Sequence, residues 1–247
     1  GYLILSGTQT MRQDSISVFT GGNMRFSFKN FLQFTRDILH TLIHGDLDSS
    51  DFIIIDELEV VFASVAKSGS SSIKTSIFGE FSKDRSIHYH ISDFSNKRIP
   101  KNKRSYFSFS YVRNPYDRVL SCYNNKFNMK DESEFLYSNY LFGYLKNEDS
   151  LEDFVRKISK IPNFLCDRHF KTQYSIIHSK GAIMNHIGRL ENIKEDYEDI
   201  RKRYDFNELT ILNKTKDPKE QIFLSEELKE KIFEKFEIDF REFGYSK

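Results

Sequence analysis

Apolar runs with the composition of β-strands alternate along this chain with segments of helical periodicity. The runs rich in β-branched and aromatic residues predict strands at 52–55, 60–65, 87–91, 106–112 and 182–187, with a short strand or turn at 211–212. Helices are predicted at 28–44, about 72–81, from 115 onward, through most of 131–160, and at 191–204 and 225–237. This alternation is typical of helices that cover a sheet. The sequence therefore predicts an α/β layered domain with a mostly parallel central sheet.

The charge balance argues against one class of protein, those that coat nucleic acids. The 247 residues carry 37 Lys and Arg against 36 Asp and Glu, a formal net charge of +1, without the basic excess of proteins that coat nucleic acids. We therefore expect no nucleic-acid partner and a local patch for any polyanion. No stretch approaches the roughly 20 apolar residues that cross a bilayer. Cys122 and Cys166 match neither a disulfide framework nor a zinc site, so we expect buried free thiols, with a single bridge as the alternative.

A loop of small residues follows the second predicted strand, in the segment VVFASVAKSGSSSIKTSI at 60–77. Small residues let backbone N–H groups converge on an anion, the start of the next helix adds positive potential, and Lys67 supplies a mobile cation. The pattern indicates a site for a phosphate or phosphosulfate group. Lys67 precedes Gly69, so the GxxxxGKS/T pattern of nucleotide hydrolases is absent. The alternative is a serine-rich turn in solvent.

A second pattern occupies 107–123, where the strand ends at Arg113 and a helix begins at Pro115 with Asn114 as its N-cap. The carboxyl ends of strands in open α/β sheets bind ligands, and the planar fork of arginine suits two phosphate oxygens. Ser121 lies in the second turn of the helix, so both side chains can meet on one phosphate. The alternative is an ion pair of Arg113 or Arg118 with Asp117.

Together the two patterns resemble the PAPS-dependent carbohydrate sulfotransferases, particularly the uronyl and heparan 2-O-sulfotransferases. AKSGSSS at 66–72 is similar to the family's 5′-phosphosulfate loop, PKSGSTS, and YVRNPYDRVLSCY at 111–123 is similar to its 3′-phosphate motif, FVRxPxxRxxSxY. The second similarity is the more specific, because Arg, Pro, Arg, Ser and Tyr all fall in register. Ala66 stands where the family often has proline, which changes the stiffness of the loop more than its chemistry.

Weaker similarities to the same family follow downstream. They lie at 167–173 (DRHFKTQ), 187–192 with Asp196 (IGRLEN), 212–215 (LNKT) and 239–245 (DFREFGY). In the first of these, Thr172 replaces a proline of the family. The loop at 212–215 is similar to one that closes over the donor. The resemblance covers about residues 58–247, and residues 1–50 match no family pattern.

The resemblance implies a P-loop-like three-layer sandwich, with residues 51–247 as the sulfotransferase domain and residues 1–50 as an extension whose one helix packs on it. It implies in-line transfer of a sulfuryl group from PAPS to a glycan hydroxyl, with PAP as product and no metal. Lys67 is expected to bond the oxygen between the 5′-phosphate and the sulfuryl group, and Arg113 and Ser121 to bind the 3′-phosphate. The residues expected to hold the donor are Lys67, Ser68, Gly69, Ser70, Ser71, Ser72, Arg113, Ser121, Thr215 and Lys216.

A base must accept the proton of the acceptor hydroxyl, and histidine titrates near neutral pH. In SIHYHISDF at 86–94, His88 and His90 share one face if the segment is a strand, and the pair is similar to the histidines of uronyl 2-O-sulfotransferases. We expect His90 to be the base and His88 to support it or to touch the acceptor. Two ordinary strand histidines, or a carboxylate base, are the alternatives. The carboxylates in reserve are Glu57, Glu59 and Glu80, and the resemblance adds His169, Arg168 and Lys171 as residues that contact the acceptor.

The basic loop at 95–104 carries five cationic side chains and is expected to guide an acidic polysaccharide, unless it is an ordinary solvated loop. A nucleotide kinase or NTPase, and a non-catalytic glycan-binding module on the same scaffold, stay open as alternative functions. Richness in Lys, Asn, Ile and Phe favours a bacterial cytoplasmic enzyme that modifies a capsule or lipopolysaccharide. The alternative location is the Golgi lumen, with an anchor outside this chain.

Overall fold

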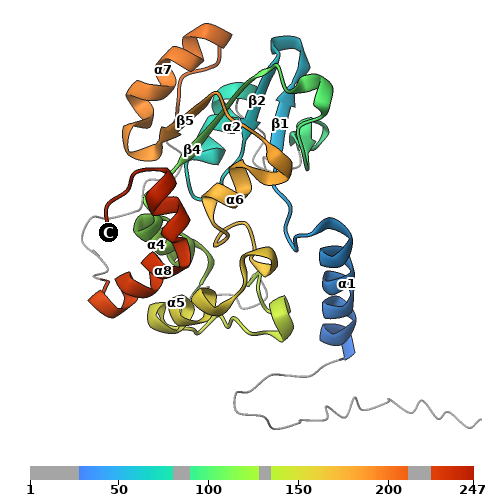
Figure 1. Ribbon diagram of the computed structural model, residues 1–247, viewed down its shortest axis with the longest axis vertical. Coiled ribbons are helices and arrows are strands. Elements are labelled where there is room, and N and C mark those ends of the chain that lie inside the picture. Colours follow the sequence, from blue (N-terminus) through green and yellow to red (C-terminus); the bar gives the residue numbers. More distant parts are fainter. Residues whose placement is uncertain (1–27, 80–89, 128–134, 211–223) are drawn as a thin grey trace, which may run out of the picture.

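The computed structural model describes residues 28–79, 90–127, 135–210 and 224–247. Within them a five-stranded sheet has the order β3-β1-β2-β4-β5 (Figure 1). The strands are β1 Phe52–Ile55, β2 Val60–Ala63, β3 Ser95–Asn96, β4 Phe107–Val112 and β5 His186–Arg189. The α-helices are α1 Phe28–His44, α2 Ser70–Phe78, α4 Pro115–Lys126, α5 Leu151–Lys160, α6 Gln173–Ile177, α7 Ile193–Tyr204 and α8 Glu226–Glu242. The expected α/β class is confirmed.

The direction of β1 corrects the prediction of a mostly parallel sheet. β2 pairs parallel with β4, and β4 with β5, but β1 runs antiparallel to both of its neighbours. The reason lies in the connection between β1 and β2. It consists of residues 56–59, including a 3-10 turn at Asp56–Leu58, whereas parallel neighbours need a crossover of about a dozen residues. The sheet is therefore mixed.

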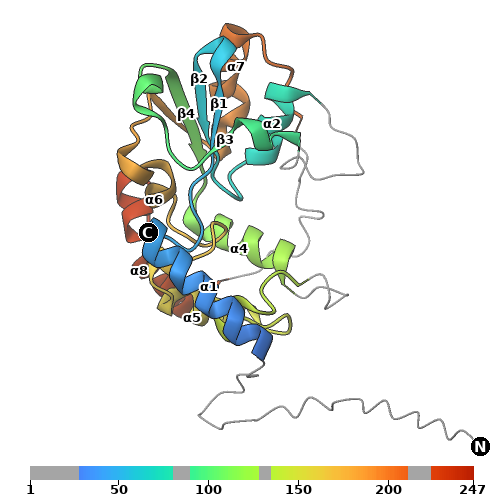
Figure 2. The same cartoon turned by 90° about the vertical axis from the view of Figure 1, so that its right-hand side faces the viewer.

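Both faces of the central strands are covered, which explains their continuous apolar sequences. Ile53 and Phe62 point to one face, where Ile73 of α2 and Tyr197 of α7 pack on them. On the other face, the neighbouring side chains of β1 and β2 pack against Ala182, and Val112 packs against residues of α6. Figures 1 and 2 show the sheet between these layers.

A helical half lies beyond the carboxyl ends of β2 and β4, where α4, α5 and α8 pack together (Figure 1). Its core is rich in aromatic rings, including Phe127, Phe154 and Phe170. Cys122 and Cys166 belong to this core as buried free thiols, as expected. The strand ends of the sheet thus face a rigid helical surface.

Several boundaries differ from the predictions. β5 begins at His186 rather than at residue 182, because the Asn185 side chain accepts hydrogen bonds from Ser108 N (2.8 Å) and Ser108 Oγ (2.9 Å) at the strand entrance. In the described part of 131–160, the α-helix spans only Leu151–Lys160. His90 has helical backbone conformation and is exposed, so it does not belong to the predicted strand. Residues 87–89 and 211–212 lie outside the described residues.

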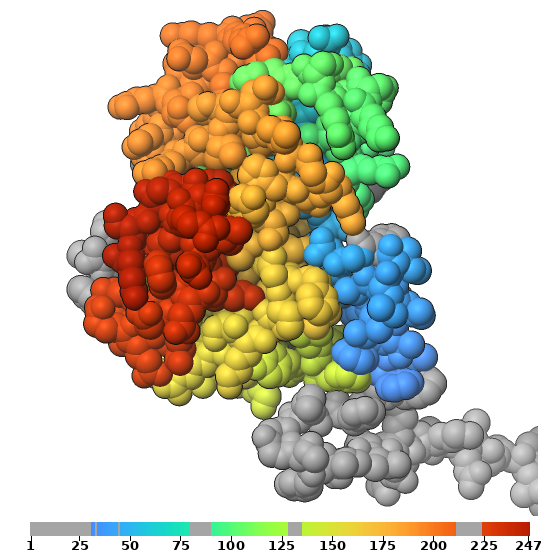
Figure 3. All heavy atoms as spheres, viewed as in Figure 1, coloured from blue at the N-terminus to red at the C-terminus, as the bar shows by residue number. Residues whose placement is uncertain are grey.

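α1 has the predicted bounds and ends at Gly45, whose φ of 82° suits glycine. It lies at the edge of the molecule, where Phe34 packs on Phe142 with ring centroids 4.0 Å apart (Figure 3). Large apolar side chains of α1, such as Leu42 at 76% exposure, face outward. The following segment is bonded to the rest of the chain through Asp46 and Asp48. These bonds hold the segment before residue 50 against the rest of the chain, and the division at residue 50 stays a prediction.

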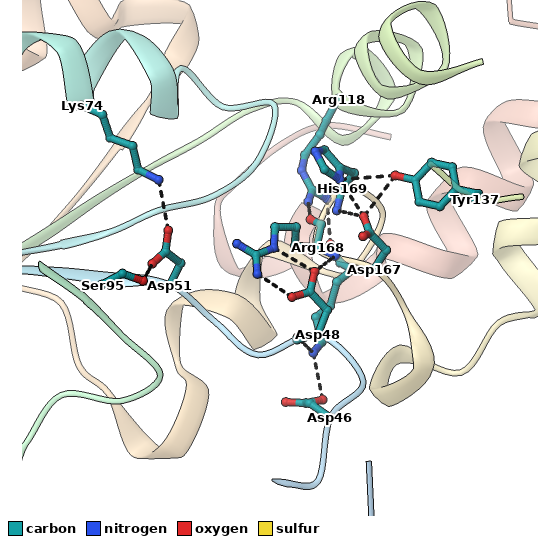
Figure 4. Close-up of polar contacts among 11 residues, drawn as sticks. Asp46, Asp48, Asp51, Lys74, Ser95, Arg118, Tyr137, Asp167, Arg168 and His169 are labelled. Carbon is teal, nitrogen blue, oxygen red and sulfur yellow. Dashed lines mark hydrogen bonds and ion pairs between the residues drawn. The ribbon is translucent and has the colours of Figure 1, made fainter. Parts of the chain in front are cut away.

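A buried ion pair joins the start of β1 to α2. Lys74 Nζ lies 3.0 Å from Asp51 Oδ2, and both side chains are almost completely buried. Ser95 Oγ donates to the other carboxylate oxygen, so Asp51 also holds β3 (Figure 4). Burial would raise the pKa of Asp51, but Lys74 and Ser95 outweigh it and lower that pKa. The pair therefore links three elements of the sheet.

We expect D51A to lower the free energy of unfolding by about 3–5 kcal/mol, because it leaves the Lys74 ammonium buried and uncompensated. The double variant D51A/K74M is expected to recover part of this loss. Urea unfolding followed by circular dichroism measures both. K247A, which breaks the exposed pair with Glu230, is the matched control and should change stability by less than about 1 kcal/mol. Equal effects of D51A and K247A would contradict the argument.

Candidate functional site

Two loops meet at the carboxyl edge of β2 and β4. The strands are parallel and in register, with Ala63 opposite Ser110, so the chain leaves both at the same edge. Arg113 Nη1 donates a hydrogen bond to the backbone carbonyl of Lys67 at 3.5 Å. The structure therefore brings together the lysine-bearing loop and the arginine that the sequence singles out.

The first turn of α2 follows the loop that leaves β2 at this edge. Its N-cap is Gly69, which makes no side-chain cap, and the next three residues are Ser70, Ser71 and Ser72. The first backbone N–H groups of a helix have no partner within the helix, and the helix dipole adds positive potential there. Glycine is required at 69, because φ is 79° and a Cβ would lie 2.8 Å from Leu190 Cδ1. This turn is suited to an anion, as predicted.

Lys67 directs its ammonium along α4. Nζ donates to Asn125 Oδ1 at 2.7 Å, and the backbone of Lys67 has the left-handed φ of 68°. Burial lowers the pKa of Lys67 to about 8, and the cations Lys126 and Arg113 act in the same direction. Among the described residues, neither Lys67 nor Arg113 forms an ion pair with a carboxylate. Positive charge is therefore gathered here without an internal counter-ion.

Ser121 belongs to the same region. It is half-buried and lies one helical turn before Asn125, so both side chains occupy one stripe of α4. The helix begins as predicted, with Pro115 in its first turn and the Asn114 side chain accepting from Tyr116 N. Ser121 is thus carried on the helix face that Lys67 contacts.

Gln173 clamps the two loops, a role that the sequence analysis missed. Its Oε1 accepts from Ser68 Oγ and from Arg113 N, both at 2.9 Å, and its Nε2 donates to Arg113 O at 2.8 Å. Asp239 in turn accepts from Gln173 N at 2.8 Å. The sequence signal for this role was the place of Gln173 as the last residue of DRHFKTQ, the segment at 167–173 that is similar to the family. The hydroxyl of Ser68 is fully buried in this clamp. The predicted contact of Ser68 with PAPS stays untested.

Arg118 is a second residue whose role the sequence did not reveal. Its guanidinium is buried and donates to three backbone carbonyls, those of Ala66 (3.0 Å), Arg168 (2.8 Å) and Lys171 (2.7 Å). The alternative ion pair with Asp117 is therefore wrong for Arg118. One side chain fixes the lysine-bearing loop against residues 168–171.

The three residues expected at the acceptor have different surroundings (Figure 4). Arg168 donates to both oxygens of Asp48, and buried Lys171 pairs with Asp46 at 2.8 Å. These contacts hold the segment after α1, and the predicted acceptor contacts of Arg168 and Lys171 stay untested. His169 differs, because its ring bonds to Asp167 within the same segment.

The structure does not describe four of the other predicted residues. His88, Glu80, Thr215 and Lys216 are outside the described residues. His90 is exposed in a helical turn next to the 3-10 turn Ser92–Phe94, so the argument that it shares a strand face with His88 fails.

The amino edge of the sheet holds two of the other candidate side chains and the basic loop. Glu57 and Glu59 follow β1 there, opposite the lysine-bearing loop, which is unfavourable for a base at Lys67. The basic loop reaches the same edge, where Lys103 pairs with Asp56 at 2.7 Å beside a small cavity lined by Arg104 and Tyr106.

Comparison with known protein families agrees with this geometry. A model of the sulfotransferase family matches residues 50–246, most of the chain. The chain belongs to the sulfotransferase family. Among the described residues of this sulfotransferase, no helix combines the length and apolar character that a membrane crossing requires.

Individual relatives are distant in sequence. Human carbohydrate sulfotransferase 10 is 24% identical over 256 residues, covering 85% of this chain and 72% of the relative. Rat carbohydrate sulfotransferase 11 is 22% identical over 277 residues, covering 96% of this chain and 75% of the relative. No solved structure matches. These relatives are vertebrate proteins, and they give no support to the expected bacterial cytoplasmic location.

We expect Q173L to lower the free energy of unfolding by about 2–4 kcal/mol, because it leaves Ser68 Oγ and both backbone groups of Arg113 without their buried partner. Thermal and urea unfolding measure the change. N185L is the matched control, because the Asn185 amide also accepts from a backbone N–H and a serine hydroxyl, those of Ser108, but at the amino end of β5. PAP binding should weaken in Q173L and not in N185L. Weaker PAP binding in N185L than in Q173L would refute the clamp.

Proposed function

We propose that this sulfotransferase transfers a sulfuryl group from PAPS to a hydroxyl of a glycan. The observation that supports it is the convergence of Lys67, Arg113 and the first turn of α2, a cationic site without an internal counter-ion among the described residues. PAPS carries anionic groups at two ends, which suits one site with two cationic parts. The names of the relatives support a carbohydrate acceptor.

In this proposal Lys67 and the N–H groups of Ser70 to Ser72 bind the 5′-phosphosulfate, while Arg113 and Ser121 bind the 3′-phosphate. The reaction is an in-line displacement, in which positioning and charge supply most of the acceleration. The acceptor oxygen attacks sulfur, and the bond between sulfur and the 5′-phosphate oxygen breaks. The Lys67 ammonium offsets the charge that develops on that oxygen. A histidine accepts the proton of the acceptor hydroxyl.

The test is transfer of labelled sulfuryl from PAPS to a panel of unsulfated neutral and uronic-acid-containing polysaccharides, read by mass spectrometry. Thermal shift with PAP, ATP–Mg²⁺ and sulfated glycans accompanies it, because a ligand stabilises the protein that binds it. We expect PAP to stabilise the chain and at least one polysaccharide to gain sulfate. Tighter binding of ATP–Mg²⁺ would indicate a nucleotide kinase instead, and glycan binding without PAP binding would indicate a binding module.

R113A is expected to weaken PAP binding by about ten- to hundredfold, because a hydrogen bond to a charged group contributes about 1.5–3 kcal/mol. Isothermal titration calorimetry measures the Kd. R203A is the matched control, since Arg203 lies over Phe107 at the opposite end of β4. If R113A and R203A bind PAP equally well, Arg113 does not belong to the donor site.

PAP affinity is also expected to depend on pH through Lys67. The ammonium is charged below its pKa of about 8 and neutral above it, so the attraction for PAP is lost as pH rises. We expect the Kd for PAP to increase by about tenfold between roughly pH 7 and pH 9.5. A tenfold change in affinity corresponds to a difference of about one unit between the pKa of Lys67 in the complex and in the free protein. K67M should bind weakly at both pH values. A flat profile for the wild type would contradict the role of Lys67.

A further inference from the structure

His169, Asp167 and Tyr137 form a compact cluster that the donor site does not use. His169 Nδ1 lies 2.6 Å from Asp167 Oδ1, and the same oxygen accepts from His169 N at 2.9 Å and from the Tyr137 hydroxyl at 3.2 Å (Figure 4). The cluster therefore fixes the imidazole from its Nδ1 side.

The charge of Asp167 decides which ring nitrogen carries the proton. Burial would raise the pKa of Asp167, but its hydrogen bonds to His169 and Tyr137 outweigh burial and lower that pKa. An ionised carboxylate only accepts hydrogen bonds, so in the neutral form of the imidazole Nδ1 donates and Nε2 keeps its lone pair. Among the described residues, Nε2 has no hydrogen-bond partner. The ring is thus held in the tautomer that accepts a proton at Nε2.

Hydrogen bonds to backbone carbonyls place His169 beside the lysine-bearing loop, which is the donor loop of the proposed function. Arg118 bonds the carbonyls of Arg168 and Lys171, on either side of His169, and with the same guanidinium the carbonyl of Ala66, directly before Lys67. Tyr137 of the cluster lies in the same hydrophobic core as Cys122 of α4, and the Lys67 ammonium bonds to Asn125 of that helix. The cluster and the donor loop therefore border the same part of α4.

We propose that His169 is the general base of the transfer and that Asp167 is its positioning residue; this rests on the proposed function. As the acceptor oxygen bonds to sulfur, its proton passes to Nε2 of His169. The electron pair of the breaking bond stays on the 5′-phosphate oxygen of PAP. A carboxylate behind the ring orients it and stabilises the imidazolium that forms. His90, by contrast, is exposed in a helical turn.

The experiment measures turnover of the full chain with PAPS and the polysaccharide that the wild type sulfates. H169A and H169Q are expected to lower kcat by about a hundredfold or more, while the Kd for PAP changes less than about twofold. Free imidazole should restore part of the activity of H169A. H90A should keep kcat within about threefold of the wild type. Near-normal kcat in both His169 variants would overturn the proposal, and loss of kcat in H90A alone would return the role to His90.

A matched control is H186Q, because His186 also bonds to a carboxylate, through Nε2 to Asp196 at 3.0 Å, but at the amino end of β5. H186Q should leave kcat unchanged. D167N should lower kcat by about tenfold or more without a matching change in KM for the polysaccharide.

Nitrogen NMR of the imidazole tests the assignment without any acceptor. We expect a proton on Nδ1 of His169 in the wild type and its loss from that position in D167N. A proton on Nε2 in the neutral wild-type ring would refute the base role. If the wild type sulfates no polysaccharide and does not bind PAP, the proposed function fails, whatever the tautomer.

Discussion

The guanidinium of Arg118 holds the candidate site together. It is buried, and its three hydrogen bonds reach the loop before Lys67 and the segment that carries His169. Burial lowers the pKa of Arg118, while Asp239 and the nearby thiols act to raise it. The planar guanidinium carries five N–H donors in a fixed arrangement, and each of its three nitrogens donates to one backbone carbonyl. Together with the Gln173 clamp, this side chain joins the lysine-bearing loop to the segment that carries His169.

Around that contact, some cationic side chains form ion pairs within the protein and others do not. The buried or half-buried cations Lys74, Arg168 and Lys171 are neutralised by Asp51, Asp48 and Asp46. Lys67 and Arg113 are not paired in this way among the described residues, although both are partly buried. Cations gathered without counter-ions cost stability, so an anionic ligand is the natural partner of this arrangement.

The sequence predicted the elements better than their pairing. β1, α1 and the start of α4 came from apolar runs and capping residues that act locally, and the structure confirms them. The parallel pairing of β1 was wrong because four linking residues force a hairpin, and the start of β5 was wrong because Asn185 occupies the ladder. The base was assigned to a strand that His90 does not join, since periodicity of two does not by itself specify a strand.

The sequence by itself determined the small-residue loop after β2, the arginine that follows β4, and membership of the sulfotransferase family, because these depend on residues that are neighbours along the chain. Only the tertiary structure decided that Gln173 clamps Ser68 to Arg113 and that Arg118 joins Ala66 to Arg168. Those contacts join residues more than 45 positions apart. Their partners are mostly backbone groups, which every residue carries, so a pattern of side chains can single out Gln173 and Arg118 but not the groups that they bind.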